Sequence, residues 1–252
     1  MKKVIQALLQ RMLGFENYLF YFSRFKIWTL KWDSQEQEGD FNFFLTLLKP
    51  TDQVLDIGAN IGIMTALMAK TCPQGKVFAF EPVPENVKAW HRVVASMNLQ
   101  NTQMFPLALG AETSVVEMEM PLMKGVRMQG LSHIRHQTIA GYEEVADRYQ
   151  VKQIPLDDCQ GLPDRIDAIK MDVENYEQYV LMGARKLLAR HQPLIYCELW
   201  ENENRERCFE ILRQLDYKIM ILEQDQLQTF QVGVHGHHNF FFIPAARVSE
   251  FL

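Results

Sequence analysis

A glycine-rich segment early in the chain has the residue types of a ligand-binding loop. Residues 54–62 alternate apolar side chains with four residues suited to such a loop, namely Asp56, Gly58, Asn60 and Gly62. Glycine lets the backbone turn sharply and approach a ligand without a Cβ in the way. A helix beginning directly after the segment would offer free N–H groups and its positive dipole end to an anionic group. We therefore predict a ligand loop between a strand and a helix.

The acids around this loop indicate which nucleoside cofactor it binds. Glu81 ends the next apolar run, where a carboxylate is placed to accept hydrogen bonds from both hydroxyls of a ribose. Asp56 stands where a dinucleotide loop has its first glycine, and a carboxylate beside a pyrophosphate is unfavourable. The same carboxylate is favourable beside the ammonium and sulfonium groups of S-adenosylmethionine. The two acids thus favour S-adenosylmethionine over a dinucleotide.

A second polar cluster follows a later apolar run. Lys170, Asp172 and Glu174 stand at alternate positions there. Alternate residues of a strand project to one side, and open α/β sheets bind ligands beyond the carboxyl ends of their strands. We expect the cluster at the mouth of the cleft, with Asp172 as first candidate for a general base and Glu174 as second. Two alternatives stay open: the acids cap the following helix, or they bind Mg²⁺.

Histidines supply further candidates outside the strands. His133, in a polar segment led by Gly130, is a third candidate for the base, with a solvated loop residue as the alternative. His235, His237 and His238 lie close together in the sequence but lack the spacing of helical metal ligands. A loop beside an edge strand is the expected interpretation of this group. No metal is therefore predicted.

The elements that must position these residues alternate between strand and helix. Expected strands cover residues 53–57, 76–80, 102–109, 115–120, 166–172, 194–199, 217–222 and 239–243. Expected helices include residues 63–71, 84–97, 142–149 and 206–215, with another between the fourth and fifth main strands. This alternation predicts a mainly parallel sheet with helices on both faces, and the last two strands predict an antiparallel addition at one edge. We expect one domain over residues 38–252, preceded by a helical extension over residues 1–37.

The N-terminal residues differ from the rest in charge and composition. Residues 1–32 contain six Lys or Arg, one Glu and eight aromatic residues, whereas the whole chain of 252 residues has a net charge of −5. No run reaches the roughly 18 apolar residues of a membrane span, and charges interrupt every apolar run, so no signal peptide is expected. We expect residues 4–32 to form helices that cover a substrate cleft. The alternative is that residues 1–32 lie on the anionic inner face of a membrane.

Composition excludes several classes of protein. With 48% hydrophobic and 23% charged residues, the chain is neither disordered nor a collagen-like repeat. The acidic total argues against a nucleic-acid partner. Four dispersed cysteines without a Cys-x-x-Cys pair indicate reduced thiols and a cytoplasmic protein. The oligomeric state cannot be predicted from these data.

Taken together, these segments resemble the FkbM-type S-adenosylmethionine-dependent methyltransferases. The resemblance covers residues 38–244, and Asn175 stands where the family usually has glycine. The resemblance rests on residues 54–62, Phe80-Glu81-Pro82, Ala108-Leu109-Gly110 and residues 169–177, 193–198 and 239–244. The resemblance implies a class I methyltransferase fold, which is an α/β, Rossmann-like fold with a seven-stranded, mostly parallel sheet and an antiparallel last strand.

The resemblance also implies roles for the predicted site residues. Asp56 and the loop Gly58–Gly62, with Asn60, are expected to hold the methionine end of the cofactor, aided by Asp172. Glu81 is expected to bind the ribose, and Ala108 and Leu109 to flank the adenine. The implied reaction is methyl transfer to oxygen on a sugar, a glycan or a secondary metabolite. A nucleotide-dependent oxidoreductase and a non-catalytic binding relative remain as alternatives.

Overall fold

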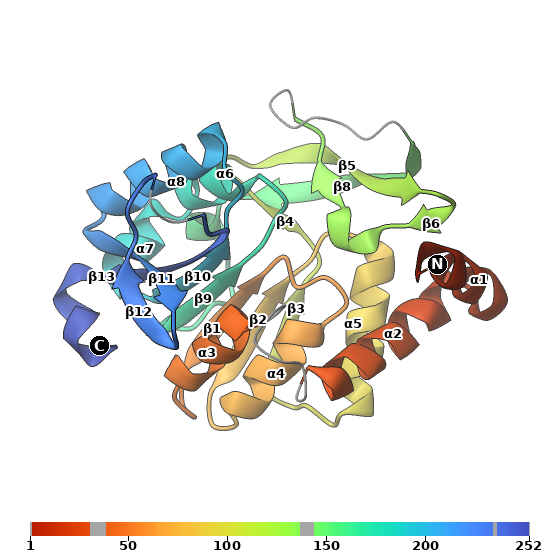
Figure 1. Ribbon diagram of the computed structural model, residues 1–252, viewed down its shortest axis with the longest axis horizontal. Coiled ribbons are helices and arrows are strands. Elements are labelled where there is room, and N and C mark those ends of the chain that lie inside the picture. The colour runs from red at the N-terminus through yellow and green to blue at the C-terminus, as the bar shows by residue number, and fades with distance from the viewer. Residues whose placement is uncertain (1, 31–38, 137–143, 234–235, 252) are drawn as a thin grey trace.

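The computed structural model of the chain describes residues 2–30, 39–136, 144–233 and 236–251 (Figure 1). Its largest element is an eight-stranded sheet in the order β12-β11-β13-β10-β9-β1-β2-β3. The strands are β1 (Gln53–Ile57), β2 (Lys76–Phe80), β3 (Thr102–Phe105), β9 (Ala168–Met171), β10 (Leu194–Glu198), β11 (Tyr217–Glu223), β12 (Gln226–Thr229) and β13 (Asn239–Pro244).

The strand directions bring the predicted site segments to one edge of the sheet. Strands β3, β2, β1, β9 and β10 run parallel, whereas β13 runs antiparallel to both β10 and β11. Parallel strands present their carboxyl ends at the same edge, so the residues after β1, β2 and β9 meet there. The mainly parallel sheet with an antiparallel strand is confirmed. The sheet has eight strands because β12 is added beyond β11.

Helices bury both faces of this sheet. They are α3 (Gly39–Leu47), α4 (Ile63–Thr71), α5 (Pro84–Ser96), α6 (Glu177–Met182), α7 (Arg185–His191) and α8 (Glu203–Gln214), with 3-10 turns η2 (Leu156–Asp158) and η3 (Ala245–Glu250). Leu55 of β1 packs in the core that contains Phe209 of α8, whereas the adjacent Val54 packs in the core that contains Phe44 of α3. Continuous apolar runs therefore form these strands because both of their faces are covered.

A second sheet lies above the first in Figure 1 and was not anticipated in the sequence. It has the order β4-β8-β5-β6, and β7 also pairs with β5. Its strands are β4 (Ala108–Leu109), β5 (Ser114–Met123), β6 (Val126–Arg127), β7 (His133–Ile134) and β8 (Val145–Ile154), and the 3-10 turn η1 (Gln129–Leu131) precedes β7. The segment at residues 115–120 is a strand, as expected.

Two predictions in this region are wrong. The helix expected over residues 142–149 is instead the beginning of β8 from Val145 onward, which pairs antiparallel with β5. The strand expected over residues 102–109 divides at Pro106 into β3 and β4, which belong to different sheets. Proline lacks the backbone N–H that a strand ladder requires, so the chain leaves the first sheet there.

Two N-terminal helices, α1 (Lys2–Leu13) and α2 (Phe15–Thr29), lie beside α5 and β6 (Figure 1). Gly14 separates them with φ 74°, a conformation that glycine adopts without strain. Helix α2 buries Tyr18, Leu19, Ser23 and Ile27 against the body. The hydroxyl of Ser23 donates to the backbone oxygen of Ile61 at 3.2 Å. The expected packing of this segment on the body is confirmed for residues 2–30.

Candidate functional site

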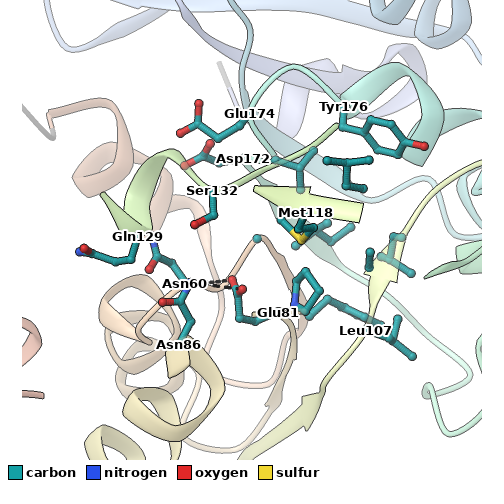
Figure 2. A pocket seen from close by; sticks show the side chains of 18 of the residues that line it. Asn60, Glu81, Asn86, Leu107, Met118, Gln129, Ser132, Asp172, Glu174 and Tyr176 are labelled. Atoms are coloured by element: carbon teal, nitrogen blue, oxygen red, sulfur yellow. Dashed lines mark hydrogen bonds between the residues drawn. The ribbon is translucent and has the colours of Figure 1, made fainter. Parts of the chain in front are cut away.

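A cavity of about 60 Å³ lies where β1, β2 and β9 end (Figure 2). One part of its lining comes from the glycine loop and from the ends of β2 and β9. The rest comes mainly from the second sheet and its connections, including β4. Seven predicted site residues line it, namely Gly58, Asn60, Glu81, Ala108, Leu109, Asp172 and Glu174. Segments that are far apart in the sequence thus lie together at this edge of the sheet. Their positions directly after strands predicted this arrangement.

The charged residues that line this cavity in the described part of the chain are all carboxylic acids. Among the described residues that line it, the charged ones are Glu81, Asp172 and Glu174. Among the described residues, the side-chain oxygens of Asn60 and Asn86, which line this cavity, are buried and have no hydrogen-bond partner. A buried acceptor without a partner is costly, so these oxygens fit a ligand that brings donors. Ribose hydroxyls, an ammonium and a sulfonium suit this cavity, whereas a pyrophosphate does not.

Glu81 is held in place by three donors. Its Oε2 accepts from the Asn60 N–H at 2.8 Å, and its Oε1 accepts from the Val83 N–H at 2.8 Å and the Asn86 Nδ2 at 3.3 Å. Burial raises the pKa of the Glu81 carboxyl to about 7, against the opposing effect of these donors. The group is therefore fixed in direction and close to its titration point at neutral pH.

The two loop glycines are required by packing. A Cβ on Gly58, where φ is 78°, would lie 1.8 Å from the backbone oxygen of Asp172. A Cβ on Gly62, where φ is 83°, would lie 2.9 Å from Cδ1 of Trp90. Gly62 is the N-cap of α4, and it lines neither this cavity nor a second, larger cavity that adjoins it. Gly58 thus lets the ends of β1 and β9 approach, and Gly62 lets α4 begin against α5.

Asp56 lies behind the loop, away from the cavity surface. Its side chain is fully buried, and its Oδ2 accepts from the hydroxyl of Thr65, which in turn accepts from Nε1 of Trp90 at 3.0 Å. Burial raises the pKa of the Asp56 carboxyl. The sequence placed Asp56 among the cofactor contacts, but in the structure it lines neither cavity because its β1 position points into the packed layer between sheet and α4.

Lys170 connects this buried acid with the cavity. Its Nζ donates to the backbone oxygen of Gly58 at 3.0 Å and lies 3.7 Å from Oδ1 of Asp56 and 3.8 Å from Oδ2 of Asp172. Burial opposes the charge of the Lys170 ammonium, but the carboxylates of Asp172 and Asp56 outweigh it, so its pKa is raised. An ammonium group whose charge is favoured by these carboxylates therefore lies between the two acids.

Asp172 and Glu174 share the rim of the cavity, and Figure 2 shows their carboxyl groups on the same side of it. The Asp172 side chain is 37% exposed. Glu174 and Asn175 both have positive φ, 54° and 69°, so asparagine does sustain the turn at the position where the resemblance led us to expect glycine. Burial, with Asp172 and other nearby carboxylates, raises the pKa of Glu174 to about 8.

Two alternative roles were left open for Asp172 and Glu174, namely capping the following helix and binding Mg²⁺. The N-cap residue Tyr176 makes no side-chain cap hydrogen bond, and the Gln178 N–H in the first turn of α6 donates to Oδ1 of Asn204 at 3.1 Å. Within the described residues, neither Asp172 nor Glu174 makes the helix cap that was left open as an alternative. Instead Glu177, the first residue of α6, accepts from the Val173 N–H at 3.2 Å. Within the described ranges, no group of three or more His, Cys, Asp or Glu side chains is arranged to hold a metal ion.

None of the described histidine candidates, His133, His237 and His238, lines the cavity. His133 is buried in β7, with Nδ1 3.1 Å from the backbone oxygen of Leu131. Its neighbours Ser132 and Ile134 line the cavity while His133 does not, because successive residues of extended chain face opposite sides. The side chain of His133 therefore does not reach the position that a general base in this cavity requires. His237 lies 3.3 Å from a Glu223 carboxylate oxygen. His235 lies outside the described residues.

Several lining residues were missed in the sequence. They come mainly from the second sheet and its connections, and they are Met118, Gln129, Gly130, Ser132, Ile134 and Tyr176. These positions follow no strand-end or glycine pattern, and their placement depends on the pairing of β5 with β7 and β8. The alternating apolar residues of β5 were the available signal for this sheet.

A larger cavity of about 340 Å³ adjoins the first. The two cavities share five lining residues, Gly58, Asn60, Gln129, Gly130 and Asp172. The other walls of the larger cavity come from α1 and α2, the start of α4, and η1, through residues that include Gln6, Phe22, Lys26, Leu30, Ile63, Met64 and Leu131. The N-terminal helices thus cover a cleft, as expected, and Asp172 lies where the two cavities meet.

Comparisons with known proteins agree with this geometry. Residues 56–241 match the model of the methyltransferase FkbM domain. A curated relative, Methyltransferase 1 of Beauveria bassiana, is 30% identical over 142 residues, which are 52% of this chain and 57% of that protein. The chain thus spans little more than half the length of this relative.

A solved structure shows the same fold. The FkbM methyltransferase of Methylobacillus flagellatus has a TM-score of 0.52 at 18% identity, over 77% of this chain and 44% of that one. An rRNA methylase of Streptococcus thermophilus has a TM-score of 0.46 at 13% identity, over 80% of this chain and 90% of that one. Neither likeness indicates the acceptor. Together with the cavity of acceptors at the strand ends, the match over residues 56–241 shows that the chain belongs to the FkbM methyltransferase family, whose cofactor is S-adenosylmethionine.

Proposed function

We propose that the protein transfers a methyl group from S-adenosylmethionine to a hydroxyl oxygen of a sugar, a glycan or another metabolite. The observation that carries this proposal is that the charged residues lining the first cavity, in the described part of the chain, are all acids. One of these acids, Asp172, also lines the second cavity. S-adenosylmethionine supplies an activated methyl group when bound, so the protein contributes mainly binding, orientation and exclusion of water.

The first cavity is the proposed adenosine site. Glu81 is directed by its three donors and has lone pairs left to accept the ribose hydroxyls. Ala108 and Leu109 offer apolar walls for the adenine. The methionine end is assigned to the shared segment at Gly58 and Asn60, close to the start of α4, because the N-terminal end of a helix favours a carboxylate. Asp56 supports this site indirectly, since it holds Lys170 beneath the loop.

Asp172 is the proposed general base. An alcohol has a high pKa, so a carboxylate that accepts its proton during methyl transfer lowers the barrier. Asp172 lines both cavities and its side chain is partly exposed, which allows an acceptor to reach it. Glu174 is less suitable because its pKa of about 8 leaves it mostly protonated at neutral pH.

The larger cavity is the proposed acceptor site. Its walls are mostly apolar, and its charged lining residues in the described part of the chain are Lys26, Lys170 and Asp172. This lining suits a small molecule or one end of a glycan with an apolar part. The net charge of −5 is the reason to expect no nucleic-acid acceptor.

The substitution Asp172→Asn tests this function. A panel of hydroxylated sugars and lipid extracts is incubated with labelled S-adenosylmethionine, and the methylated atom is identified by mass spectrometry. We expect Asp172→Asn to lower kcat by about 10²- to 10⁴-fold, while calorimetry shows the cofactor dissociation constant changed by less than about threefold. The matched variant Glu174→Gln is expected to keep most of the activity.

Three results would contradict the proposal. Binding of a nicotinamide dinucleotide without binding of S-adenosylmethionine would favour an oxidoreductase. Binding of S-adenosylmethionine with no transfer to any hydroxyl would favour a non-catalytic relative or another acceptor atom. A loss of cofactor affinity in Asp172→Asn without a loss of kcat would assign Asp172 to cofactor binding.

A further inference from the structure

Helix α1 has its polar side toward the body and its apolar side toward solvent. Gln6 donates to the hydroxyl of Tyr18 at 2.8 Å. Gln10 donates to the backbone oxygen of Arg127 and accepts from its N–H, both at 3.1 Å. The opposite side of the helix carries Val4 and Met12, which are 72% and 73% exposed. This orientation is the reverse of an ordinary surface helix, whose apolar side faces the core.

The exposed apolar side chains of the molecule are concentrated on the two N-terminal helices. Of the thirteen large hydrophobic side chains exposed in the described part of the chain, nine lie within residues 4–28. They form what we call the N-terminal apolar surface: Val4, Ile5, Leu8, Leu9, Met12, Leu13, Tyr21, Phe25 and Trp28. A concentration of exposed apolar side chains on one pair of helices marks an interaction site, whereas single exposed apolar residues do not.

Positive charge accompanies this surface. Arg11 and Arg24 are exposed, and Lys26 is half-buried. The only acid within residues 2–30 is Glu16, whose carboxylate lies 2.7 Å from Nζ of Lys88 on α5. Within residues 2–30 the basic residues therefore outnumber the acids that could pair with them, although the chain as a whole has a net charge of −5. Such a surface is complementary to an anionic partner.

We propose that the N-terminal apolar surface docks on an anionic lipid bilayer, lying in its headgroup region. A basic helix with a wide apolar side is the kind of element that lies in this region without crossing it. Tyr21, Phe25 and Trp28 stand at i, i+4 and i+7 on α2, and aromatic rings are favoured at the membrane interface. No helix in the described ranges is long and apolar enough to cross a bilayer.

A second copy of the chain fits this surface less well. In a two-fold symmetric contact, the same patch occurs on both sides, so Arg11 and Arg24 would meet their own copies. No acid within residues 2–30 is free to pair with them, because Glu16 is already bound to Lys88. Like charges brought together at an interface are unfavourable. An anionic membrane avoids this repulsion.

Docking would place the larger cavity next to the bilayer. Helix α2 exposes Phe25 and Trp28 on one side and contributes Phe22 and Lys26 to the cavity on another. An amphipathic molecule held in the membrane would then have a short path to Asp172. This consequence rests on the proposed methyl transfer, whereas the docking itself does not.

Vesicle flotation with the full chain tests the docking. The probes are vesicles of phosphatidylcholine alone and vesicles that contain about one-third phosphatidylserine. We expect binding to the anionic vesicles, weaker binding at high salt, and little binding to phosphatidylcholine alone. Val4→Glu is expected to weaken binding at least about tenfold, because it places a charge in the apolar contact. Val115→Glu is the matched control: Val115 is 67% exposed on β5, and its substitution should leave binding unchanged.

Each other outcome overturns the docking. Equal flotation of the Val4→Glu and Val115→Glu variants would show that another surface binds the lipid. Absence of flotation with anionic vesicles would exclude the bilayer as the partner. A dimer in lipid-free sedimentation that Val4→Glu dissociates would assign the surface to a second copy. Circular dichroism and Tm of both variants confirm that they fold, and cofactor binding is measured separately, so a failure here is distinct from a failure of the proposed function.

Discussion

The carboxyl group of Glu81 is subject to two opposing effects. Burial disfavours its charge, while the N–H groups of Asn60 and Val83 and the amide of Asn86 favour it, and burial prevails to give a pKa of about 7. Ribose hydroxyls are donors, and they are bound best by the ionised form of the group. Cofactor binding should therefore favour loss of the Glu81 proton.

This coupling predicts a pH dependence of cofactor affinity. Glu81 is mostly protonated at about pH 6 and mostly ionised at about pH 8, so affinity for S-adenosylhomocysteine should rise about tenfold over this range. Calorimetry at a series of pH values measures the change. Glu81→Gln should bind more weakly at the higher pH and lose most of the dependence, whereas the exposed-residue control Glu210→Gln should retain it. An affinity that falls as the pH rises would contradict this assignment.

At the residue scale, the sequence located backbone positions better than side-chain directions. The cavity is lined by Glu81, Asp172 and Glu174, which follow the ends of parallel strands. Residues in such positions lie at the edge of the sheet where ligands bind. Asp56 and His133 do not line the cavity, because one residue of register decides whether a side chain faces the cavity or the packed layer. Neither spacing nor composition reveals that register where the partner strand is unknown.

The approach of β1 and β9 depends on one glycine. The Asp172 N–H donates to the backbone oxygen of Ile57 at 3.0 Å, which brings the Asp172 carbonyl over the α-carbon of Gly58. The same contact holds the general-base candidate next to the cofactor loop. Packing between two strand ends and the chemistry of the site therefore depend on the same position.

The substitution Gly58→Ala should separate these strand ends. Its Cβ would overlap the Asp172 carbonyl and its φ would be unfavourable, so we expect a loss of about 2–4 kcal/mol in the free energy of unfolding. Urea denaturation measures this loss. Gly236→Ala is the control, because a Cβ there meets no atom within 4 Å and the φ is ordinary. Equal stability of the two variants would mean that the strand ends move apart without cost.

At the element scale, local patterns predicted the parallel sheet but not the second one. The strands of the main sheet are buried on both faces and appear in the sequence as unbroken apolar runs. Strand β8 has only some of its residues buried, and it pairs with β5, which lies more than 20 residues earlier in the chain. This long-range pairing overrides the helical pattern at residues 145–149, and no neighbouring residue signals it.

At the scale of the whole molecule, two sheets and two N-terminal helices meet around the pair of cavities. The main sheet provides the strand ends, the second sheet provides η1 and β7, and α2 closes the larger cavity. The charge is divided in the same way: acids face the first cavity, and basic residues lie on the N-terminal helices. The net charge of −5 conceals this division.

Strand β4 connects the first cavity with the second sheet. Ala108 and Leu109 pair with Gln153 and Ile154 of β8, and the same two residues line the first cavity. A ligand that orders Leu109 therefore also orders its partner strand, so that cofactor binding and local opening of the second sheet share a coupling free energy.

Hydrogen–deuterium exchange measures this coupling. Saturation with S-adenosylhomocysteine should slow exchange of the backbone amides in β5 and β8 as well as in the glycine loop, while β12, at the far edge of the main sheet, should be unchanged. Slowing confined to residues 56–62 would show that the sheets open independently. Such coupling would stabilise the paired state of the second sheet when the cofactor is bound, and it would favour binding of the cofactor before the acceptor.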